Sequence, residues 1–168
     1  MATGWLEDNG SHYYLTGSGA MAVGWVKVDG SWYYMDGSGA MQTGWINDNG
    51  TWYYTGPNGV MATGWLEEGG AHYYLRGDGS MATGWREMDG AWYYFDGSGR
   101  MATGITQVNG LHYYLDPSTG RMAADTVLDI GGASYQADSQ GVLTQISSGE
   151  PVPGVQPGTQ DVILTPVG

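Results

Sequence analysis

The chain has 168 residues, of which 41% are apolar, and it contains 31 glycines, 8 tryptophans and 13 tyrosines but one phenylalanine. So many glycines argue against helices, because a glycine inside a helix costs on the order of 1 kcal/mol relative to alanine. The net charge of -12 disfavours nucleic-acid binding, which needs a basic surface, and favours a cationic ligand. The chain has no cysteine, which excludes disulfides and thiolate chemistry.

No apolar run approaches the roughly 20 residues that a transmembrane helix needs, so we expect no membrane insertion. No signal peptide is visible at the start of the chain. Because Met1 is also the first methionine of a repeat, we expect the chain to be a piece of a longer protein.

A repeat of 20 residues runs through most of the sequence. Gly-Trp pairs begin at residues 4, 24, 44, 64 and 84, and Tyr-Tyr pairs and single methionines keep the same spacing. A sixth unit has Ile105 in place of the tryptophan, and a seventh keeps only Tyr135 of the aromatic set. A degenerate last unit is typical of the cap of a repeat array. We therefore predict one repeat domain over residues 1–146 and a Pro/Gly-rich linker or tail over residues 147–168, in which residues 161–164 could form one strand.

Each unit contains a two-residue turn, such as Asn9-Gly10, between two apolar runs. Asn-Gly, Asp-Gly and Gly-Gly pairs favour type I′ hairpin turns, because both central residues need a positive φ. Such a turn places Trp5 opposite Tyr14 on one face and Leu6 opposite Tyr13 on the other. Since a lone hairpin is marginally stable in water, each one must pack on its neighbours. The predicted fold is all-β, a solenoid or superhelix of about seven consecutive β-hairpins.

The segments GWVKVDGSWYYMDGSGAM and GWREMDGAWYYFDGSGRM resemble the choline-binding, or cell-wall-binding, repeats of Gram-positive surface proteins, autolysins and phage lysins. The resemblance covers residues 2–143, and six of the seven units match at the turn, the tyrosine pair and the methionine. Glucan-binding repeats of glucosyltransferases and receptor-binding repeats of large glucosylating toxins are similar at the same positions. The resemblance implies a hairpin superhelix with choline sites between consecutive hairpins.

Aromatic faces that converge on one point attract a quaternary ammonium by cation–π interaction, worth about 0.5–1 kcal/mol each when exposed. A methionine thioether supplies apolar contact for the methyl groups of the cation. The resemblance implies that two tryptophans come from one hairpin and that the second tyrosine and the methionine come from the next. The implied complete cages are Trp25, Trp32, Tyr54 and Met41; Trp45, Trp52, Tyr74 and Met61; and Trp85, Trp92, Tyr114 and Met101.

Three units depart from this pattern, because His12, His72 and His112 stand where the family has tryptophan. We therefore expect weak or absent binding at the two sets built on Trp5 and Trp65, and no cage in the unit of Ile105. In the predicted register each histidine faces a polar residue, so we favour a structural role over a catalytic one. The two weaker sets are Trp5, Tyr34 and Met21, and Trp65, Tyr94 and Met81.

We interpret one face of each hairpin as core and the other as the ligand site. The first tyrosine of each pair shares a face with Leu6 or Val26, and we interpret it as core. The tryptophan face is interpreted as the ligand site, because a solenoid needs only one buried face per hairpin and packing alone does not explain two aromatic faces.

No catalytic or metal site is predicted. Glu67 and Glu68 are adjacent in a strand and point to opposite faces, so they cannot act as an acid/base pair. The histidines lack metal-ligand spacing. Asp36 and Asp78 lie in Gly-rich turns, where Asx-turn hydrogen bonding is a commoner role than Ca²⁺ binding. We expect no cofactor and no enzymatic activity in this chain, although a parent protein could carry a catalytic domain elsewhere.

Three functions remain open. The leading one is a binding module that attaches a parent protein to choline or phosphocholine on cell-wall polymers such as teichoic acids, at the extracellular surface. The alternatives are a module that binds glucan or host glycans and a structural spacer. A sugar site needs a repeated rim of polar groups, but the candidate positions vary too much among the units, whereas a cation needs no such rim. These positions are Lys27, Asn47, Glu67 and Glu87.

Overall fold

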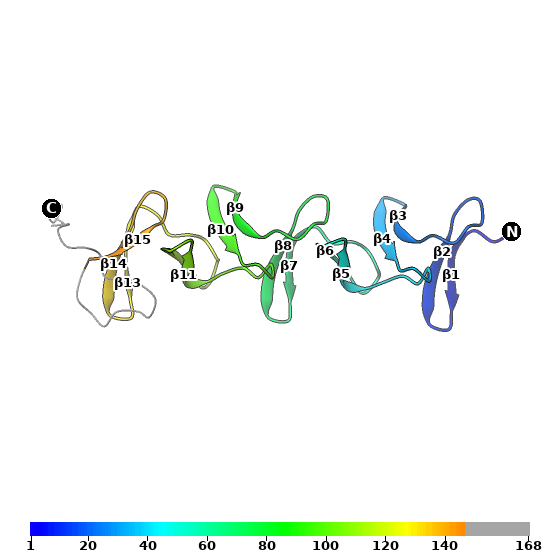
Figure 1. Ribbon diagram of the computed structural model, residues 1–168, viewed down its shortest axis with the longest axis horizontal. Helices are drawn as coiled ribbons and strands as arrows, with labels where there is room; N and C mark the ends of the chain where they lie inside the picture. Colours follow the sequence, from blue (N-terminus) through cyan, green and yellow to red (C-terminus); the bar gives the residue numbers. More distant parts are fainter. Residues whose placement is uncertain (147–168) are drawn as a thin grey trace. The chain divides into compact units, whose positions relative to one another are not determined.

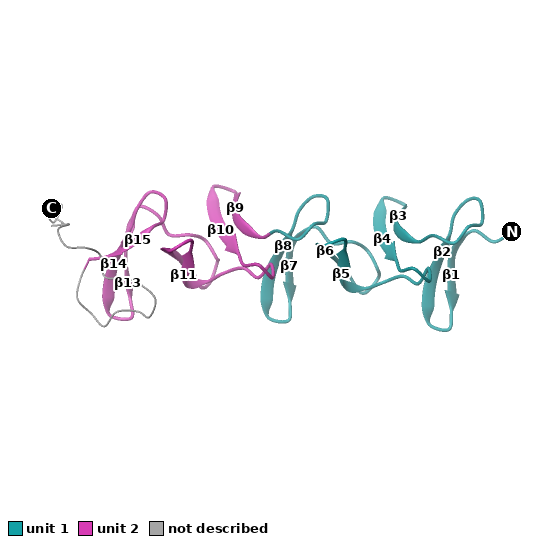
Figure 2. Ribbon diagram, viewed as in Figure 1, with its two compact units in different colours: residues 1–82 teal, residues 83–168 magenta. Residues whose placement is uncertain are grey.

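The computed structural model describes residues 1–146, and the predicted tail with its short strand lies outside the described residues. The described part consists of β-strands joined by tight turns, which confirms the all-β prediction (Figure 1). No helix in this part is long and apolar enough to cross a membrane. The described residues form two compact units, Met1–Ala82 and a second that begins at Thr83, and we describe each by itself (Figure 2).

The first unit contains four hairpins, each a two-stranded antiparallel sheet. The observed register is the predicted one, with Trp5 opposite Tyr14 and Leu6 opposite Tyr13. The strands are β1 (Gly4–Asp8), β2 (Ser11–Leu15), β3 (Gly24–Val28), β4 (Ser31–Met35), β5 (Gly44–Asp48), β6 (Thr51–Thr55), β7 (Gly64–Glu68) and β8 (Ala71–Leu75).

The hairpin turns have the backbone that their sequences predict. Asn9 has a φ of 50° and Gly10 a φ of 80°, and Asp29 and Gly30 have values of 48° and 85°. Positive φ at both central residues defines a type I′ turn, whose twist matches that of the flanking strands. The turn residues therefore fix which side chains share a face of each hairpin.

The methionine after each hairpin connects that hairpin to the one before it. Met61 forms a β-bridge with Thr55 at the end of β6. Its N–H also donates a 2.8 Å hydrogen bond to the carbonyl of Trp32 in β4. Met41 and Met81 make the corresponding 2.8 Å bonds to the preceding hairpins. A repeated backbone hydrogen bond thus sets the step from one hairpin to the next within the unit.

The second unit contains two two-stranded hairpins and one three-stranded sheet. In the last sheet the short final strand pairs with β14 and places Tyr135 opposite Gln145, an addition that the repeat pattern did not predict. The strands are β9 (Gly84–Met88), β10 (Ala91–Phe95), β11 (Gly104–Val108), β12 (Leu111–Leu115), β13 (Thr126–Ile130), β14 (Ala133–Ala137) and β15 (Leu143–Gln145).

From the second hairpin on, the last residue of the second strand is part of the core. Met35, Thr55 and Leu75 are fully buried in the first unit, and Phe95 and Leu115 are fully buried in the second. Thr55 is polar, but its hydroxyl donates to the carbonyl of Gln42 at 2.9 Å, which offsets the cost of its burial.

The last hairpin of the described part carries a cluster of buried residues. Ala133, Tyr135, Ala137 and Leu143 are buried together, and Ile105 and Tyr114 are among the residues packed against them. Tyr135, the one aromatic residue that the seventh repeat retains, is therefore core, as expected of a cap.

Candidate ligand-binding site

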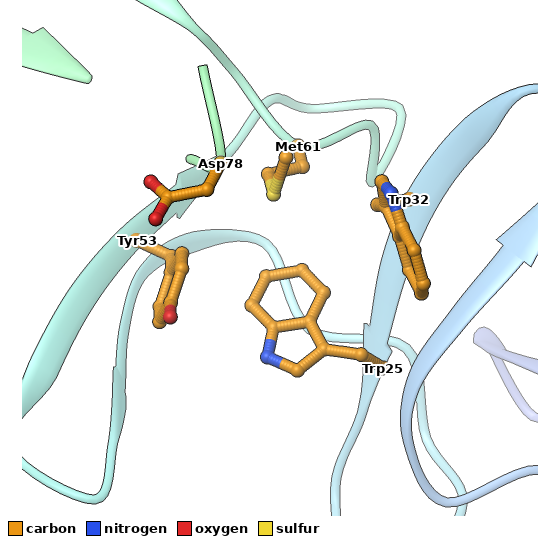
Figure 3. A pocket seen from close by; sticks show the side chains of 5 residues that line it. All are labelled: Trp25, Trp32, Tyr53, Met61 and Asp78. Carbon is orange, nitrogen blue, oxygen red and sulfur yellow. The ribbon is translucent and has the colours of Figure 1, made fainter. Parts of the chain in front are cut away.

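A pocket of about 220 Å³ opens between consecutive hairpins of the first unit. Trp25, Trp32, Tyr53, Met61 and Asp78 line it, and we call it the Trp25 pocket (Figure 3). Three aromatic side chains and one thioether surround the opening, with one carboxylate at its edge.

Three successive repeats supply this pocket. Trp25 on β3 and Trp32 on β4 come from one hairpin, and Tyr53 on β6 comes from the next. The rings of Trp25 and Tyr53 are 5.0 Å apart and inclined at 64°, an edge-to-face contact that stabilises both orientations. Met61 is held by its backbone bond to Trp32, and Asp78 comes from the turn after β8.

The two tryptophans of the pocket are held differently. The indole N–H of Trp25 donates to Oδ2 of Asp48 at 3.2 Å, which fixes the half-buried ring. Trp32 is 40% exposed, so much of its ring remains available to a ligand. The ammonium of Lys27, the cross-strand partner of Trp32, lies 5.9 Å from the centroid of the Trp32 ring, at the range of a cation–π contact.

Asp78 is held at the edge of the pocket by its own turn. Its Oδ1 accepts hydrogen bonds from the hydroxyl of Ser80 at 2.6 Å and from the Ser80 N–H at 2.9 Å. The Ser80 hydroxyl is the main reason that the pKa of Asp78 lies below its ordinary value of 3.8. The carboxylate is therefore negatively charged at neutral pH.

A second pocket, of about 340 Å³, has the same plan in the second unit. The rings of Trp85 and Tyr113 are 4.8 Å apart, and the N–H of Met122 donates to the carbonyl of Trp92 at 2.8 Å. Neutral polar side chains replace the carboxylate at the edge. We call this the Trp85 pocket, and its lining is Trp85, Trp92, Tyr113, Met122, Ser139 and Gln140.

Two further aromatic sets in the first unit repeat the contact between hairpins. Trp5 lies 4.8 Å from Tyr33, and the N–H of Met41 donates to the carbonyl of His12. Trp45 lies 4.7 Å from Tyr73 and 6.5 Å from Trp52, whose carbonyl accepts from Met81. In each set the ring pair and the methionine bond follow the plan of the Trp25 pocket.

The grouping differs from the one that the resemblance implied. The first tyrosine of the next hairpin lines the pocket, Tyr53 rather than Tyr54, and the methionine comes after that hairpin, Met61 rather than Met41. The reason is the step between hairpins, which turns the face that carries the first tyrosine toward the preceding tryptophan. Tyr73 and Tyr93 are also buried, so the first tyrosine has both the predicted packing role and a place against the tryptophan.

The second tyrosines lie elsewhere. Each of five lies 5.0–5.4 Å from the tryptophan of its own hairpin: Tyr14, Tyr34, Tyr54, Tyr74 and Tyr94. The hydroxyl of Tyr54 donates to Glu68 at 3.0 Å. The pKa of Tyr54 is raised, mainly by burial and also by the nearby Glu68 carboxylate.

The remaining residues of the predicted sets also lie outside the two pockets. Tyr114 pairs with Ile105 and packs on the end cluster. Met21 and Met101 pack on turn glycines, Gly39 and Gly120. The set of Trp65, Tyr94 and Met81 takes residues from both units and stays a prediction.

The histidines face the partners that the register predicted. His12 lies 3.7 Å from Glu7, and His72 lies 3.7 Å from Glu67, each pair on the exposed surface of its hairpin. His112 is buried opposite Gln107, and its Nε2 has no hydrogen-bond partner among the described residues. No group of three or more His, Cys, Asp or Glu side chains in the described part could hold a metal ion.

The turns hold their aspartates by Asx-type hydrogen bonds, as predicted. Oδ1 of Asp36 accepts from the N–H of Ser38 at 2.8 Å and from its hydroxyl at 2.6 Å. Asp78 and Asp96 make the same pair of contacts with Ser80 and Ser98.

The repeated pockets agree with the comparison of the sequence with known families. A profile of the choline-binding repeat matches residues 2–43, 42–83 and 82–127. The chain belongs to the choline-binding repeat family. Its described part is a binding module built from such repeats. Among curated protein sequences, none matches the chain significantly.

Solved structures of choline-binding proteins have the same fold. CbpJ from Streptococcus pneumoniae TIGR4 is 43% identical with a TM-score of 0.78, and the match covers 84% of this chain and 48% of that chain. The choline-binding domain of CbpL from Streptococcus pneumoniae is 32% identical with a TM-score of 0.68, and the match covers 85% of this chain and 78% of that domain's chain.

Choline binding protein F from Streptococcus pneumoniae matches in two liganded structures. The structure with a peptidoglycan analogue is 45% identical with a TM-score of 0.79, covering 84% of this chain and 46% of that chain. The complex of CbpF with ipratropium is 41% identical with a TM-score of 0.76, covering 84% and 48%. This choline-binding repeat chain thus spans about half the length of CbpJ and CbpF.

Proposed function

We propose that the chain is a non-catalytic module that binds choline groups and thereby attaches a parent protein to cell-wall polymers, such as teichoic acids, at the extracellular surface. The observation that carries the proposal is the Trp25 pocket, where two tryptophans, one tyrosine and one methionine converge from consecutive hairpins. The Trp85 pocket repeats these four residue types in the second unit.

The lining matches the chemistry of a quaternary ammonium. Such a cation cannot donate a hydrogen bond from nitrogen, so it is recognised by ring faces and by apolar contact with its methyl groups. Each pocket offers both, and the net charge of -12 favours the approach of a cation. The exposed Trp32 and Trp92 rings, at 40% and 41%, remain available for this contact.

The relatives support both parts of the proposal. CbpF has been solved with ipratropium, and ipratropium carries a quaternary ammonium group. Choline-binding proteins of this kind are associated with the cell surface or cell wall, the location that we propose here. The parent protein's activity, if it has one, would reside in domains beyond the repeats.

Glycan binding is the second candidate, and two observations favour it. Ser139 and Gln140 line the Trp85 pocket, where they could bind hydroxyl groups. CbpF has also been solved with a peptidoglycan analogue. The Trp25 pocket has Asp78 in place of these neutral groups, so the polar rim is not repeated from site to site. A common ligand is therefore better explained by the aromatic rings and the methionine.

Tryptophan fluorescence during titration with choline tests the proposal. We expect a saturable change with a dissociation constant in the millimolar range, about 4 kcal/mol per site, because a few partly exposed cation–π contacts must offset the cost of binding. The uncharged isostere 3,3-dimethylbutan-1-ol is the matched control and should bind far more weakly.

Equal responses to choline and to the alcohol, or no response to either, would contradict the proposal. A response to soluble glucan that exceeds the response to choline would favour the glycan alternative. Retention on a quaternary-amine resin with elution by free choline gives a second readout.

A further inference from the structure

We propose that one turn residue selects the ligand charge at each pocket. Asp78 makes the Trp25 pocket selective for a cation that carries no nearby phosphate, whereas Gln140 lets the Trp85 pocket accept phosphocholine as well. This inference rests on the proposed binding of choline groups and concerns the substituent that each pocket tolerates.

The two residues occupy equivalent places. Asp78 precedes Gly79 and Gln140 precedes Gly141, and both glycines have a positive φ. The methionine of the pocket packs directly on this glycine, so that an added Cβ would overlap its side chain in both units. The residue before the glycine therefore lies beside the methionine and lines the pocket, as Figure 3 shows for Asp78.

Only one of these positions carries a charge in the described part of the chain. The residue before each corresponding positive-φ glycine is neutral in every other described turn, whereas position 78 has a carboxylate. The neutral residues are Ser18, Ser38, Asn58, Ser98, Thr119 and Gln140.

A carboxylate at this place distinguishes choline from phosphocholine. The ammonium of choline would lie among the rings with a favourable charge nearby, and hydrogen bonds from Ser80 hold that charge in place. The phosphate of phosphocholine is only two methylene groups away from the ammonium, so the carboxylate would repel it. At separations of about 6 Å in a solvated site, this repulsion corresponds to about a three- to tenfold difference in affinity.

Other charges near the two pockets affect the size of this preference. Asp48, bonded to the indole of Trp25, has the same sign as Asp78. Lys27 near Trp32 and Arg76 in the turn of Asp78 would attract a phosphate at the Trp25 pocket, and Glu87 opposite Trp92 would repel one at the Trp85 pocket, so all three reduce the difference between the pockets. These side chains are exposed, as Asp78 is, so all of these charges are screened by salt. Because Lys27, Arg76 and Glu87 stay unchanged in the variants below, the comparison of variants isolates the turn residue.

Methyl-labelled methionine reports each pocket separately by NMR. Met61 and Met122 lie in different pockets of the same molecule, and their signals can be assigned with Met61→Leu and Met122→Leu. We would titrate the full chain with choline, with phosphocholine and with inorganic phosphate. We expect the ratio of the phosphocholine to the choline dissociation constant to be about three- to tenfold larger at Met61 than at Met122.

Two substitutions should exchange the preferences. Asp78→Asn keeps the Asx turn, because Asn58 accepts the same kind of bond, from the N–H of Val60 at 3.1 Å, and it should lower the ratio at Met61 to that at Met122. Gln140→Asp should raise the ratio at Met122. Asp29→Asn is the matched control, since it removes one charge at a hairpin turn where other repeats have asparagine, and it should change neither ratio.

The possible outcomes separate the two proposals. Shifts with choline at both methionines, with equal ratios that neither substitution changes, would overturn the assignment of Asp78 and Gln140 but keep choline binding. No shift at either methionine would overturn the proposed function itself, and this inference with it. Shifts at Met122 with phosphate alone would mean that the second pocket binds the phosphate rather than the choline group, which would also overturn the inference.

Discussion

The second tryptophan of the hairpin is the residue that most distinguishes one repeat from another. Trp32, Trp52 and Trp92 are each about 40% exposed, although tryptophan is usually well buried. Their exposed faces border the proposed sites, whereas His12 and His72 present smaller rings at the same position. The difference between tryptophan and histidine should therefore decide which repeats bind.

The set around Trp5 offers the clearest test at the residue scale. Trp5 already contacts Tyr33 at 4.8 Å, and Met41 already bonds to the carbonyl of His12, so only the second indole is missing. We predict that His12→Trp adds a choline site, detected as a new shift at the Met41 methyl group and one more equivalent bound in calorimetry. Trp32→His is the reciprocal change and should weaken binding at Met61 about tenfold, the loss of one or two cation–π contacts. An unchanged Met41 signal in His12→Trp would mean that this position does not form the cage.

The sequence alone was least able to predict which individual residues line each pocket. The identities of the aromatic rings pointed to cation binding, but they did not decide between Tyr53 and Tyr54 or between Met41 and Met61. Tyr53 and Tyr54 are adjacent on one strand, so their side chains point to opposite faces of the hairpin. Which of the two reaches the preceding tryptophan therefore depends on the rotation between hairpins. The Met61 bond to Trp32 determines that rotation, and it involves backbone atoms that no side-chain pattern marks.

At the scale of the element, each turn supports a methionine of an earlier repeat. Gly79 has a φ of 86°, and a Cβ there would overlap the sulfur of Met61. Gly79→Ala should therefore cost about 1–3 kcal/mol of stability, from overpacking and from the left-handed backbone, and should displace Met61 from the Trp25 pocket.

Gly77→Ala is the matched control for this turn. A Cβ on Gly77 meets nothing within 4 Å, and proline occupies the corresponding position 57, so the backbone there suits an ordinary residue. Urea unfolding and choline titration of both variants would check the prediction. Equal effects of the two substitutions would show that the contact between glycine and methionine is unimportant.

The Asx turns predict a specific dependence on pH. The Ser38 hydroxyl is the main cause of the lowered pKa of Asp36, so this carboxylate contributes stability above its ordinary value of 3.8. That contribution is lost as pH falls through the lower pKa of the folded state. Ser38→Ala should raise the pKa of Asp36 toward 3.8, measured by carbon NMR of the carboxyl group, and should destabilise the protein more at neutral than at acid pH.

Ser18→Ala provides the comparison for Ser38→Ala. Ser18 has the same place in the first turn, but its hydroxyl bonds to that of Thr16 and to no carboxylate. It should leave the pKa of Asp36 and the pH dependence of stability unchanged. The same result for Ser38→Ala would show that the hydroxyl does not control this aspartate.

The hairpins themselves were predictable to the level of the register. A two-residue turn with positive φ at both positions leaves one pairing, so Asn9-Gly10 and its equivalents fixed the strands and the facing of each side chain. The third strand of the last sheet was only partly predictable. Leu143 pairs with Ala137 as the methionines pair with the ends of the earlier hairpins, but the extension of this pairing to Gln145 has no counterpart in the other repeats.

At the scale of the whole molecule, several weak sites act on one chain. A polymer that carries many choline groups could occupy pockets in both units at once, so its affinity would exceed that of free choline without any new contact. The net charge of -12 favours the cationic choline groups of such a polymer, rather than its phosphates, as the points of contact. Millimolar single sites are therefore compatible with stable attachment.

The last hairpin should keep the molecule from self-association. Ile105 and Tyr114 pack against the cluster of Tyr135 and its neighbours, so a chain truncated after residue 124 exposes both side chains. The same truncation removes Ser139 and Gln140 and leaves the Trp85 pocket without its edge. We predict that the truncated chain stays folded in its first unit but forms dimers or larger species, because exposed apolar faces of repeat arrays associate.

Light scattering after size exclusion checks this prediction across a range of concentrations. A chain truncated after residue 146 is the matched control, since it keeps the cap and loses only the segment beyond it, and it should have the same oligomeric state as the full chain. Tyr135→Ala should act in the same direction as the deletion, because removing a fully buried aromatic ring costs about 3–5 kcal/mol and opens the cluster. A chain ending at residue 124 that stays monomeric at high concentration, with unchanged stability, would mean that the last hairpin is not a cap.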